Sequence, residues 1–430
     1  MIKVKLIHSK KLGETLFYEK LSNGLEVFIL PKKDFYKSVA TLTAKFGSID
    51  TYFSPLEKKI PIQVPDGIAH FLEHKMFESK QGDVLHSFAK EGATINAITN
   101  FTRTSYTLST TTNIYKNIST LLDFVQDAYF TDLMIKKEKR IIEQEIKMYD
   151  NNPDWRARFK ILENMYNNHP AKNDIAGTID SINQITKEDL YACYDTFYHP
   201  NNMLLFVIGP VVPDELIKHI KNNQENKIFR GTGEFYRIPT DEDAIVNKRS
   251  DLMKFSVPIP KFFIGHKEPN PKRQGQDLLK YELSQYVLFE LMFGESSMTY
   301  EKLYDYGYIN MPFNYDCTNE EGFGFSIISG DSQDPEAIIQ MVNETIDNYK
   351  MESIKQEDAQ RAINKVIGFF LKSINSPLFI ANQFTRHYFN EMNLFRVLPT
   401  LENLSENDLV EVLHLHFSHE SQTTLIVNKP

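Results

Sequence analysis

The spacing of hydrophobic and polar positions changes along this chain and predicts strands first and helices afterwards. Two short apolar runs, 16–21 and 25–30, flank Ser22-Asn23-Gly24, a sequence typical of a β-hairpin turn. The run 39–46 predicts a further strand that ends at Gly47. The chain is therefore expected to open with paired strands.

Helical periodicity dominates the rest of the chain, with strands placed between the helices. One helix is expected around His70, and another begins at the capping sequence Thr186-Lys187-Glu188-Asp189. Helices are predicted over about 81–91, 113–149, 155–167, 186–197, 213–222, 274–293 and 356–373, and strands over 94–100, 104–110, 203–209 and 261–266. This alternation predicts the α+β class, with helices and sheets in layers.

An internal repeat predicts that the two halves are related. Residues 185–190, leading to the apolar run 204–208, resemble residues 404–409, leading to 425–427. Asp189 and Asp408 hold equivalent positions in these segments.

A similar offset sets residues 71–74 against 288–291. In that alignment Val287 faces His70 and Leu291 faces His74, so the second copy keeps a helix and loses the imidazoles.

A polar segment between the halves has the composition of a linker. Residues 226–247 hold glycines, Pro239 and an acidic run. We predict an N-terminal domain over 1–225 and a C-terminal domain over 248–430.

Composition narrows the class of protein. With 41% hydrophobic and 24% charged residues, the 430-residue chain has the composition of a globular protein. Its net charge of −9 argues against a nucleic-acid-binding surface. No signal peptide and no membrane-spanning run is expected. The two cysteines, Cys193 and Cys317, lie in apolar segments and predict free thiols in a reducing cytoplasm.

The segment His70-Phe71-Leu72-Glu73-His74 holds the strongest chemical signal. On a helix His70 and His74 share one face, so both imidazoles can reach one metal ion. Zn²⁺ is the usual occupant of such a site, and Glu73 can face a water molecule there as a general base. The alternative is that both histidines lie on an ordinary helix surface or in a satisfied core.

A third ligand is expected from the charged helix over 136–148. Glu138 and Glu145 lie two turns apart and share one face, whereas Glu143 points elsewhere and is expected to be a surface charge. The alternative is that this helix presents its acids only to water.

These two segments together resemble the insulinase/pitrilysin (M16) family of metallopeptidases. The resemblance implies His70, His74 and Glu145 as zinc ligands, Glu73 as catalytic base, and Glu138 as a supporting acid in the second shell. Further matches follow in family order: Gly92-Ala93-Thr94-Ile95-Asn96-Ala97, Gly177-Thr178-Ile179-Asp180-Ser181-Ile182 and Phe197-Tyr198-His199-Pro200-Asn201-Asn202-Met203. The second half is similar to the family more weakly.

The resemblance also implies a fold and a mode of substrate binding. The fold would be two homologous domains, each a mostly antiparallel sheet packed with helices, forming a clamshell. Peptide substrate would be added as a strand at a sheet edge that includes Asn96 and Ala97. For Asn96, a role as a turn or strand-end residue is equally open.

The sequence departs from the family at one place. Two family positions in the second half, an Arg and a Tyr that contact substrate, correspond here to Leu303 and Asn310. Tyr304, Tyr306 and Tyr308 are candidate replacements, although such aromatic clusters usually serve packing.

The metal motif and the resemblance together imply a zinc-dependent peptidase that hydrolyses unfolded peptides or small proteins held in a cavity between the halves. One alternative is a non-catalytic scaffold or peptide-binding subunit of the same fold. Another is metal-dependent hydrolysis of a non-peptide bond. A homodimer, or a heterodimer with a homologue that lacks the motif, is expected.

Overall fold

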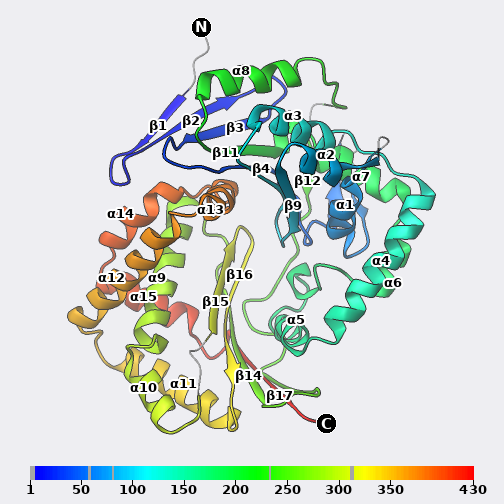
Figure 1. Ribbon diagram of the computed structural model, residues 1–430. Helices are drawn as coiled ribbons and strands as arrows, with labels where there is room; N and C mark the ends of the chain where they lie inside the picture. The colour runs from blue at the N-terminus through cyan, green and yellow to red at the C-terminus, as the bar shows by residue number, and fades with distance from the viewer. Residues whose placement is uncertain (1–4, 57–59, 80–81, 232–233, 310–313) are drawn as a thin grey trace. The chain divides into compact units, whose positions relative to one another are not determined.

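The chain folds into two compact units (Figure 1). The computed structural model describes residues 5–430 apart from 57–59, 80–81, 232–233 and 310–313. Unit 1 comprises Met1–Lys147, Asp174–Pro239 and Ile374–Phe389, and unit 2 comprises Met148–Asn173, Thr240–Ser373 and Asn390–Pro430. None of the helices in the described ranges is long and apolar enough to cross a lipid bilayer.

Unit 1 is built on a seven-stranded sheet in the order β1-β2-β3-β11-β4-β10-β9. Its strands are β1 (Lys5–Ser9), β2 (Glu14–Lys20), β3 (Glu26–Pro31), β4 (Ser38–Ala44), β9 (Ala93–Thr99), β10 (Thr104–Thr110) and β11 (Met203–Gly209). All neighbours are antiparallel except β3 and β11, which are parallel. The predicted hairpin is confirmed, since β2 and β3 pair across a turn at Gly24, whose φ is 94°.

The helices of unit 1 are α1 (Ile68–Met76), α2 (Val84–Lys90), α3 (Ile114–Val125), α4 (Asp132–Asp150), α6 (Ile179–Gln184), α7 (Lys187–Phe197), α8 (Pro213–Gln224) and α13 (Pro377–Phe389). They include five that contact this sheet: α1, α2, α3, α8 and α13. Short strands complete the unit: β5 (Tyr52–Ser54), β6 (Ile62–Gln63), β7 (Glu78–Ser79), β8 (Gly82–Asp83) and β12 (Tyr236–Arg237).

Unit 2 has a five-stranded sheet in the order β13-β17-β14-β16-β15. Its strands are β13 (Ser250–Lys254), β14 (Lys261–Lys267), β15 (Asn314–Glu320), β16 (Phe323–Asp331) and β17 (Gln422–Asn428). Its helices are α5 (Pro153–Met165), α9 (Gly275–Phe293), α10 (Met298–Asp305), α11 (Pro335–Met351), α12 (Gln356–Ser373), α14 (Val397–Glu402) and α15 (Glu406–His416).

The two sheets confirm the repeat and the α+β class. The order β3-β11-β4-β10-β9 in unit 1 corresponds strand by strand to β13-β17-β14-β16-β15 in unit 2. In both, the first pair is parallel and the others are antiparallel. The helices α7 and α15 occupy matching places and begin with matching capping boxes, Thr186 with Asp189 and Ser405 with Asp408.

One helix of each copy packs in the unit built mainly from the other copy. The helix α5 packs against β14 and β17 of unit 2, and α13 (orange in Figure 1) packs against β4 and β11 of unit 1. Phe384 of α13 lies 4.7 Å from Phe206 and 4.9 Å from Phe28 between ring centroids. Burying one phenylalanine stabilises a fold by about 2 kcal/mol. The two units defined by their contacts therefore differ from the two copies of the sequence repeat. The domain boundaries at 225 and 248 describe the copies of the repeat and remain a prediction.

Two expected segments differ in detail. The helical pattern over 113–149 forms two helices, because 126–131 leave the helical path and the N–H of Phe130 donates to the Tyr191 hydroxyl at 3.2 Å.

The linker is also more ordered than its composition predicts. Arg237 pairs with Asp50 of unit 1 at 2.5 Å. Glu242 accepts the backbone N–H groups of 167–169 in unit 2 at 2.6–2.9 Å.

Candidate metal centre

The helix α1 begins where two backbone segments touch. Gly67, the residue before α1, has a φ of 86°, and a Cβ there would lie 2.5 Å from the Ala176 carbonyl oxygen. A Cβ on Gly177 would likewise lie 2.6 Å from the Asp66 carbonyl oxygen. Both positions therefore require glycine. The Gly177 segment, noted in the sequence only as a family match, supports the start of the helix that bears the histidines.

Three side chains predicted as metal ligands come together in unit 1. His70 and His74 lie one turn apart on α1, and Glu145 reaches them from α4. His70 Nε2 lies 3.7 Å from Glu145 Oε1, and His74 Nε2 lies 3.6 Å from Glu145 Oε2. Within the described part of the chain, this is the one group of three or more His, Cys, Asp and Glu side chains close enough to hold a metal ion.

The spacing and chemistry of these atoms fit Zn²⁺. Ligands at ordinary zinc bond lengths and tetrahedral angles lie roughly 3.4 Å apart. The two measured separations are close to that value and longer than a direct hydrogen bond. Two imidazoles and one carboxylate leave a fourth position open, as in catalytic zinc sites.

Glu138 contacts the ring nitrogen of His74 that does not face Glu145. Its Oε1 lies 3.1 Å from His74 Nδ1, the ring nitrogen turned away from Glu145. Burial disfavours the charged imidazole, but the hydrogen bond and charge of Glu138 outweigh it and raise the pKa of His74. Burial also opposes the charge of Glu138, and its bonds to His74 and Lys75 outweigh burial and lower its pKa. Such a carboxylate fixes the tautomer of a metal-binding histidine.

His70 is held differently. Burial, with the neighbouring His74, lowers its pKa to about 3, so the ring is neutral and able to bind a metal at physiological pH. Its Nδ1 is buried and has no hydrogen-bond partner among the residues that the structure describes. Within the described residues, this ring therefore has no supporting carboxylate of the kind that Glu138 gives His74.

Glu73 lies on the same face of α1 as both histidines. Burial raises its pKa, which suits a general base that works near neutral pH. The hydroxyl of Thr99, at the end of β9, donates to Glu73 Oε2 at 2.5 Å.

Two contributors to this site were missed in the sequence: Thr99 and the buried Lys75. Thr99 follows the Asn96-Ala97 segment closely, and Lys75 follows His74 directly. Neither residue type marks a site by its own pattern, so no signal in the sequence distinguishes them.

Comparison with known proteins agrees with this geometry. Residues 64–179 match the family model described as Insulinase (Peptidase family M16), and residues 184–366 match that described as Peptidase M16 inactive domain. The chain is 49% identical over 410 residues to an uncharacterized zinc protease, YmfH, of Bacillus subtilis, covering 95% of this chain and 96% of that protein. This chain belongs to the M16 family.

Solved structures of M16 peptidases share the fold. A putative M16-like peptidase from Alicyclobacillus acidocaldarius is 32% identical, with a TM-score of 0.94 over 98% of this chain and 100% of that chain. Pitrilysin, at 14% identity, has a TM-score of 0.75 over 100% of this chain and 47% of its own. The first of these is a putative M16-like peptidase by name, and the second match, at 14% identity, shows the fold alone.

The M16 substrate positions lie beside the cluster but outside it. Asn96 is exposed and Ala97 half-buried on β9, the terminal strand of the unit 1 sheet. The helix α1 packs against β9, so this open edge runs beside the histidines. The roles of Asn96 and Ala97 in substrate binding remain a prediction.

Of the two positions in unit 2 where the sequence departs from the M16 substrate contacts, the structure describes one, Leu303. Leu303 is fully buried in α10, where it cannot contact a substrate. Asn310 lies outside the described residues. Tyr304 and Tyr306 are largely exposed, and Tyr304 stacks on Tyr300 with ring centroids 6.3 Å apart.

In unit 2, the helix that corresponds to α1 has an acid at the position of Glu73 but no imidazoles at the positions of the histidines. Val287 and Leu291 of α9 are buried where the repeat places the two imidazoles. Glu290, the counterpart of Glu73, is buried and pairs with Lys365 of α12 at 2.6 Å. In the repeat α12 corresponds to α4, so a lysine ammonium compensates the buried carboxylate in the half that has lost its metal ligands.

Lys365→Met is expected to destabilise unit 2, because it removes the cation beside the buried Glu290 carboxylate; among the described residues, the Tyr315 hydroxyl at 3.2 Å would remain as its hydrogen-bond donor. Breaking a buried pair costs about 3–5 kcal/mol, and on the order of 2 kcal/mol is expected here because the Lys365 side chain is 31% exposed. Urea unfolding followed by the fluorescence of Trp155, the single tryptophan and part of α5, measures the loss.

The exposed Lys302→Met serves as control, and Lys365→Met with Glu290→Gln should recover most of the stability. A Lys365→Met chain as stable as the wild type would contradict the pairing.

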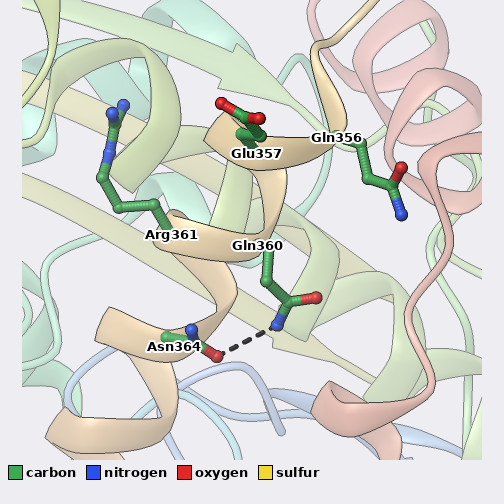
Figure 2. Close-up of a pocket in the computed structure, with 5 residues that line it drawn as sticks. All are labelled: Gln356, Glu357, Gln360, Arg361 and Asn364. Atoms are coloured by element: carbon green, nitrogen blue, oxygen red, sulfur yellow. Dashed lines mark hydrogen bonds between the residues drawn. The ribbon is translucent and has the colours of Figure 1, made fainter.

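A hollow on the surface of unit 2 carries no comparable chemistry. Figure 2 shows its five lining side chains along α12: Gln356, Glu357, Gln360, Arg361 and Asn364. All are exposed and polar, and Gln360 donates to Asn364 at 3.0 Å. The hollow is a solvated helix surface and includes no residue of the metal cluster.

Proposed function

We propose that this chain is a zinc-dependent peptidase that hydrolyses unfolded peptides or small proteins. The observation that carries the proposal is the cluster of His70, His74 and Glu145, spaced as ligands of one ion, with Glu73 on the same helix face. Relatives named as zinc proteases support it.

The residues of the chain divide the work as follows. His70, His74 and Glu145 would hold Zn²⁺. The ion, when bound, polarises the peptide carbonyl and lowers the pKa of water at its open position. Glu73 takes the proton of the attacking water and delivers it to the leaving amine. Its raised pKa favours this exchange, and Thr99 holds its carboxylate in place.

Substrate would bind as an added strand on β9. Its free edge offers backbone N–H and C=O groups beside α1, and pairing with them places few demands on side chains. Asn96 and Ala97 lie in the middle of this edge. This mode suits unfolded peptides, whose backbone groups are free to pair.

A binding subunit without activity is the competing proposal. The matched name of the C-terminal family model describes an inactive domain, and Leu303 replaces a substrate contact. The intact cluster in unit 1 favours the enzyme. A scaffold has no need of two imidazoles, a carboxylate and a supported general base at one place.

We also propose that the chain works as a dimer in the cytoplasm, with a second copy or with a homologue lacking the motif. The whole of this chain aligns with 47% of the pitrilysin chain, so one pitrilysin chain is long enough for two segments of this length. Both cysteines are buried free thiols, which suits a reducing compartment. Light scattering of the purified chain measures its self-association.

The activity is tested by incubating the zinc-loaded chain with a panel of unfolded peptides and analysing the products by mass spectrometry. Internal cleavage that stops after chelation and returns with zinc supports the proposal. A zinc-loaded chain that binds peptides without cleaving them would favour the scaffold.

A further inference from the structure

Lys75 is a lysine with no exposed surface, placed directly after His74. Its ammonium donates to two carboxylates, Glu138 at 3.3 Å and Glu78 in a short contact. Burying a charged ammonium is costly unless it is paired and hydrogen-bonded. Two carboxylates therefore stabilise this one buried ammonium, and one of them, Glu138, also contacts the metal site.

Glu138 joins this lysine to the metal site. One of its oxygens, Oε1, faces His74 Nδ1 at 3.1 Å, and the other, Oε2, accepts from Lys75. Glu138 is 5% exposed, so the loss of Lys75 would remove the cation that pairs with this buried carboxylate. Because the ammonium occupies Oε2, Oε1 is left to accept a hydrogen bond from His74 Nδ1–H, and this arrangement leaves Nε2 free for a metal.

The same group of charges connects the two helices that supply the ligands. Lys75 and Glu78 lie at the end of α1 and just after it, and Glu138 lies on α4. Lys137 of α4 donates to Glu78 at 3.0 Å, which adds a second cross-link between these segments. The position of α4 relative to α1 decides whether Glu145 reaches the histidines.

We propose that Lys75 is a positioning residue for the metal site: its buried ammonium holds Glu138 against His74 and α4 against α1, so that all three ligands are in place before the ion binds. The inference rests on the proposed zinc site and is independent of whether peptides are cleaved. Lys75 does not touch the ion and acts through Glu138.

The test measures zinc affinity by competition with a chelator of known affinity, for the full-length wild type, Lys75→Met, Glu138→Gln and the double variant. Loss of a supporting contact typically weakens metal binding about 10- to 100-fold, and this is expected for Lys75→Met. The double variant should bind zinc no more weakly than Glu138→Gln alone, because both changes remove the same link. The matched control is Lys136→Met, a change of an exposed lysine on the same helix α4 that lies outside this group of charges, and its zinc affinity should stay within a few-fold of the wild type.

A spectroscopic readout separates positioning from general stability. The visible spectrum of the Co²⁺-loaded chain reports the geometry of the ligands, and it should change in Lys75→Met and remain unchanged in Lys136→Met. If Lys75→Met does not fold, Lys75→Gln, which keeps a donor and loses the charge, provides the same comparison.

Unchanged zinc affinity and an unchanged cobalt spectrum in the folded Lys75 variant would overturn the inference. Additive losses in the double variant would also overturn it, since Lys75 would then act by a route other than Glu138. A wild-type chain that binds no zinc would overturn the zinc site itself, a result distinct from both.

Discussion

Glu73→Gln is expected to keep zinc bound and to lower peptide hydrolysis by at least about 10²- to 10⁴-fold, the usual contribution of a general base. Glutamine preserves the size of the side chain and can still accept the Thr99 hydroxyl, but it cannot take a proton at neutral pH. The three ligands are untouched, so metal content should remain at one zinc per chain. Cleavage rate and zinc content, measured on the same preparation, check both halves of the prediction.

Glu143→Gln is the matched control for this variant. Glu143 lies on α4 near Glu145 and pairs with Lys147 at 2.6 Å at the surface, as the sequence pattern predicted. The Glu143→Gln variant should cleave peptides at the wild-type rate. Undiminished turnover in Glu73→Gln would show that the base lies elsewhere.

His74→Ala is expected to abolish stoichiometric zinc binding and, with it, all zinc-dependent cleavage. The change removes one of three ligands and also one of the two partners of Glu138 described above, so the loss of affinity should exceed the about 100-fold upper range for a supporting residue. Unit 2 should stay folded, because its core contains no residue of the cluster. Metal analysis after dialysis and Trp155 fluorescence check the two statements.

His86→Ala tests whether any histidine nearby would behave alike. His86 is exposed on α2 of unit 1 and makes no part of the cluster, so this variant should retain its zinc. Full zinc occupancy in His74→Ala would refute the ligand assignment and would require a different metal site in the chain.

The elements of the site that could be predicted are those that depend on helix geometry alone. Residues four apart on a helix share a face, so His70 and His74 could be paired from the sequence, and Glu138 and Glu145 could be placed on one side of their helix in the same way. The choice between these two acids came from family resemblance. The structure brings both to the histidines, with Glu145 on the Nε2 side of His74 and Glu138 on its Nδ1 side.

The repeat was also visible in the sequence, because each copy must form the same capped helix and buried strand to complete its sheet. Thr186 and Ser405 cap equivalent helices, and such capping signals are local. The same argument placed Val287 and Leu291 at the positions of the imidazoles and predicted a second half without a metal site.

The rest depended on which segments pack together in three dimensions. These features join residues that are far apart in the chain or whose neighbours come from other elements. They are the burial of Lys75, the hydrogen bond from Thr99 to Glu73 and the pairing of Lys365 with Glu290. The packing of α5 in unit 2 and of α13 in unit 1 belongs with them. A lysine or threonine has the same local preferences whether it is buried or solvated. Its charge or hydroxyl acquires a role only when the surrounding helices exclude water and leave a specific carboxylate as its partner.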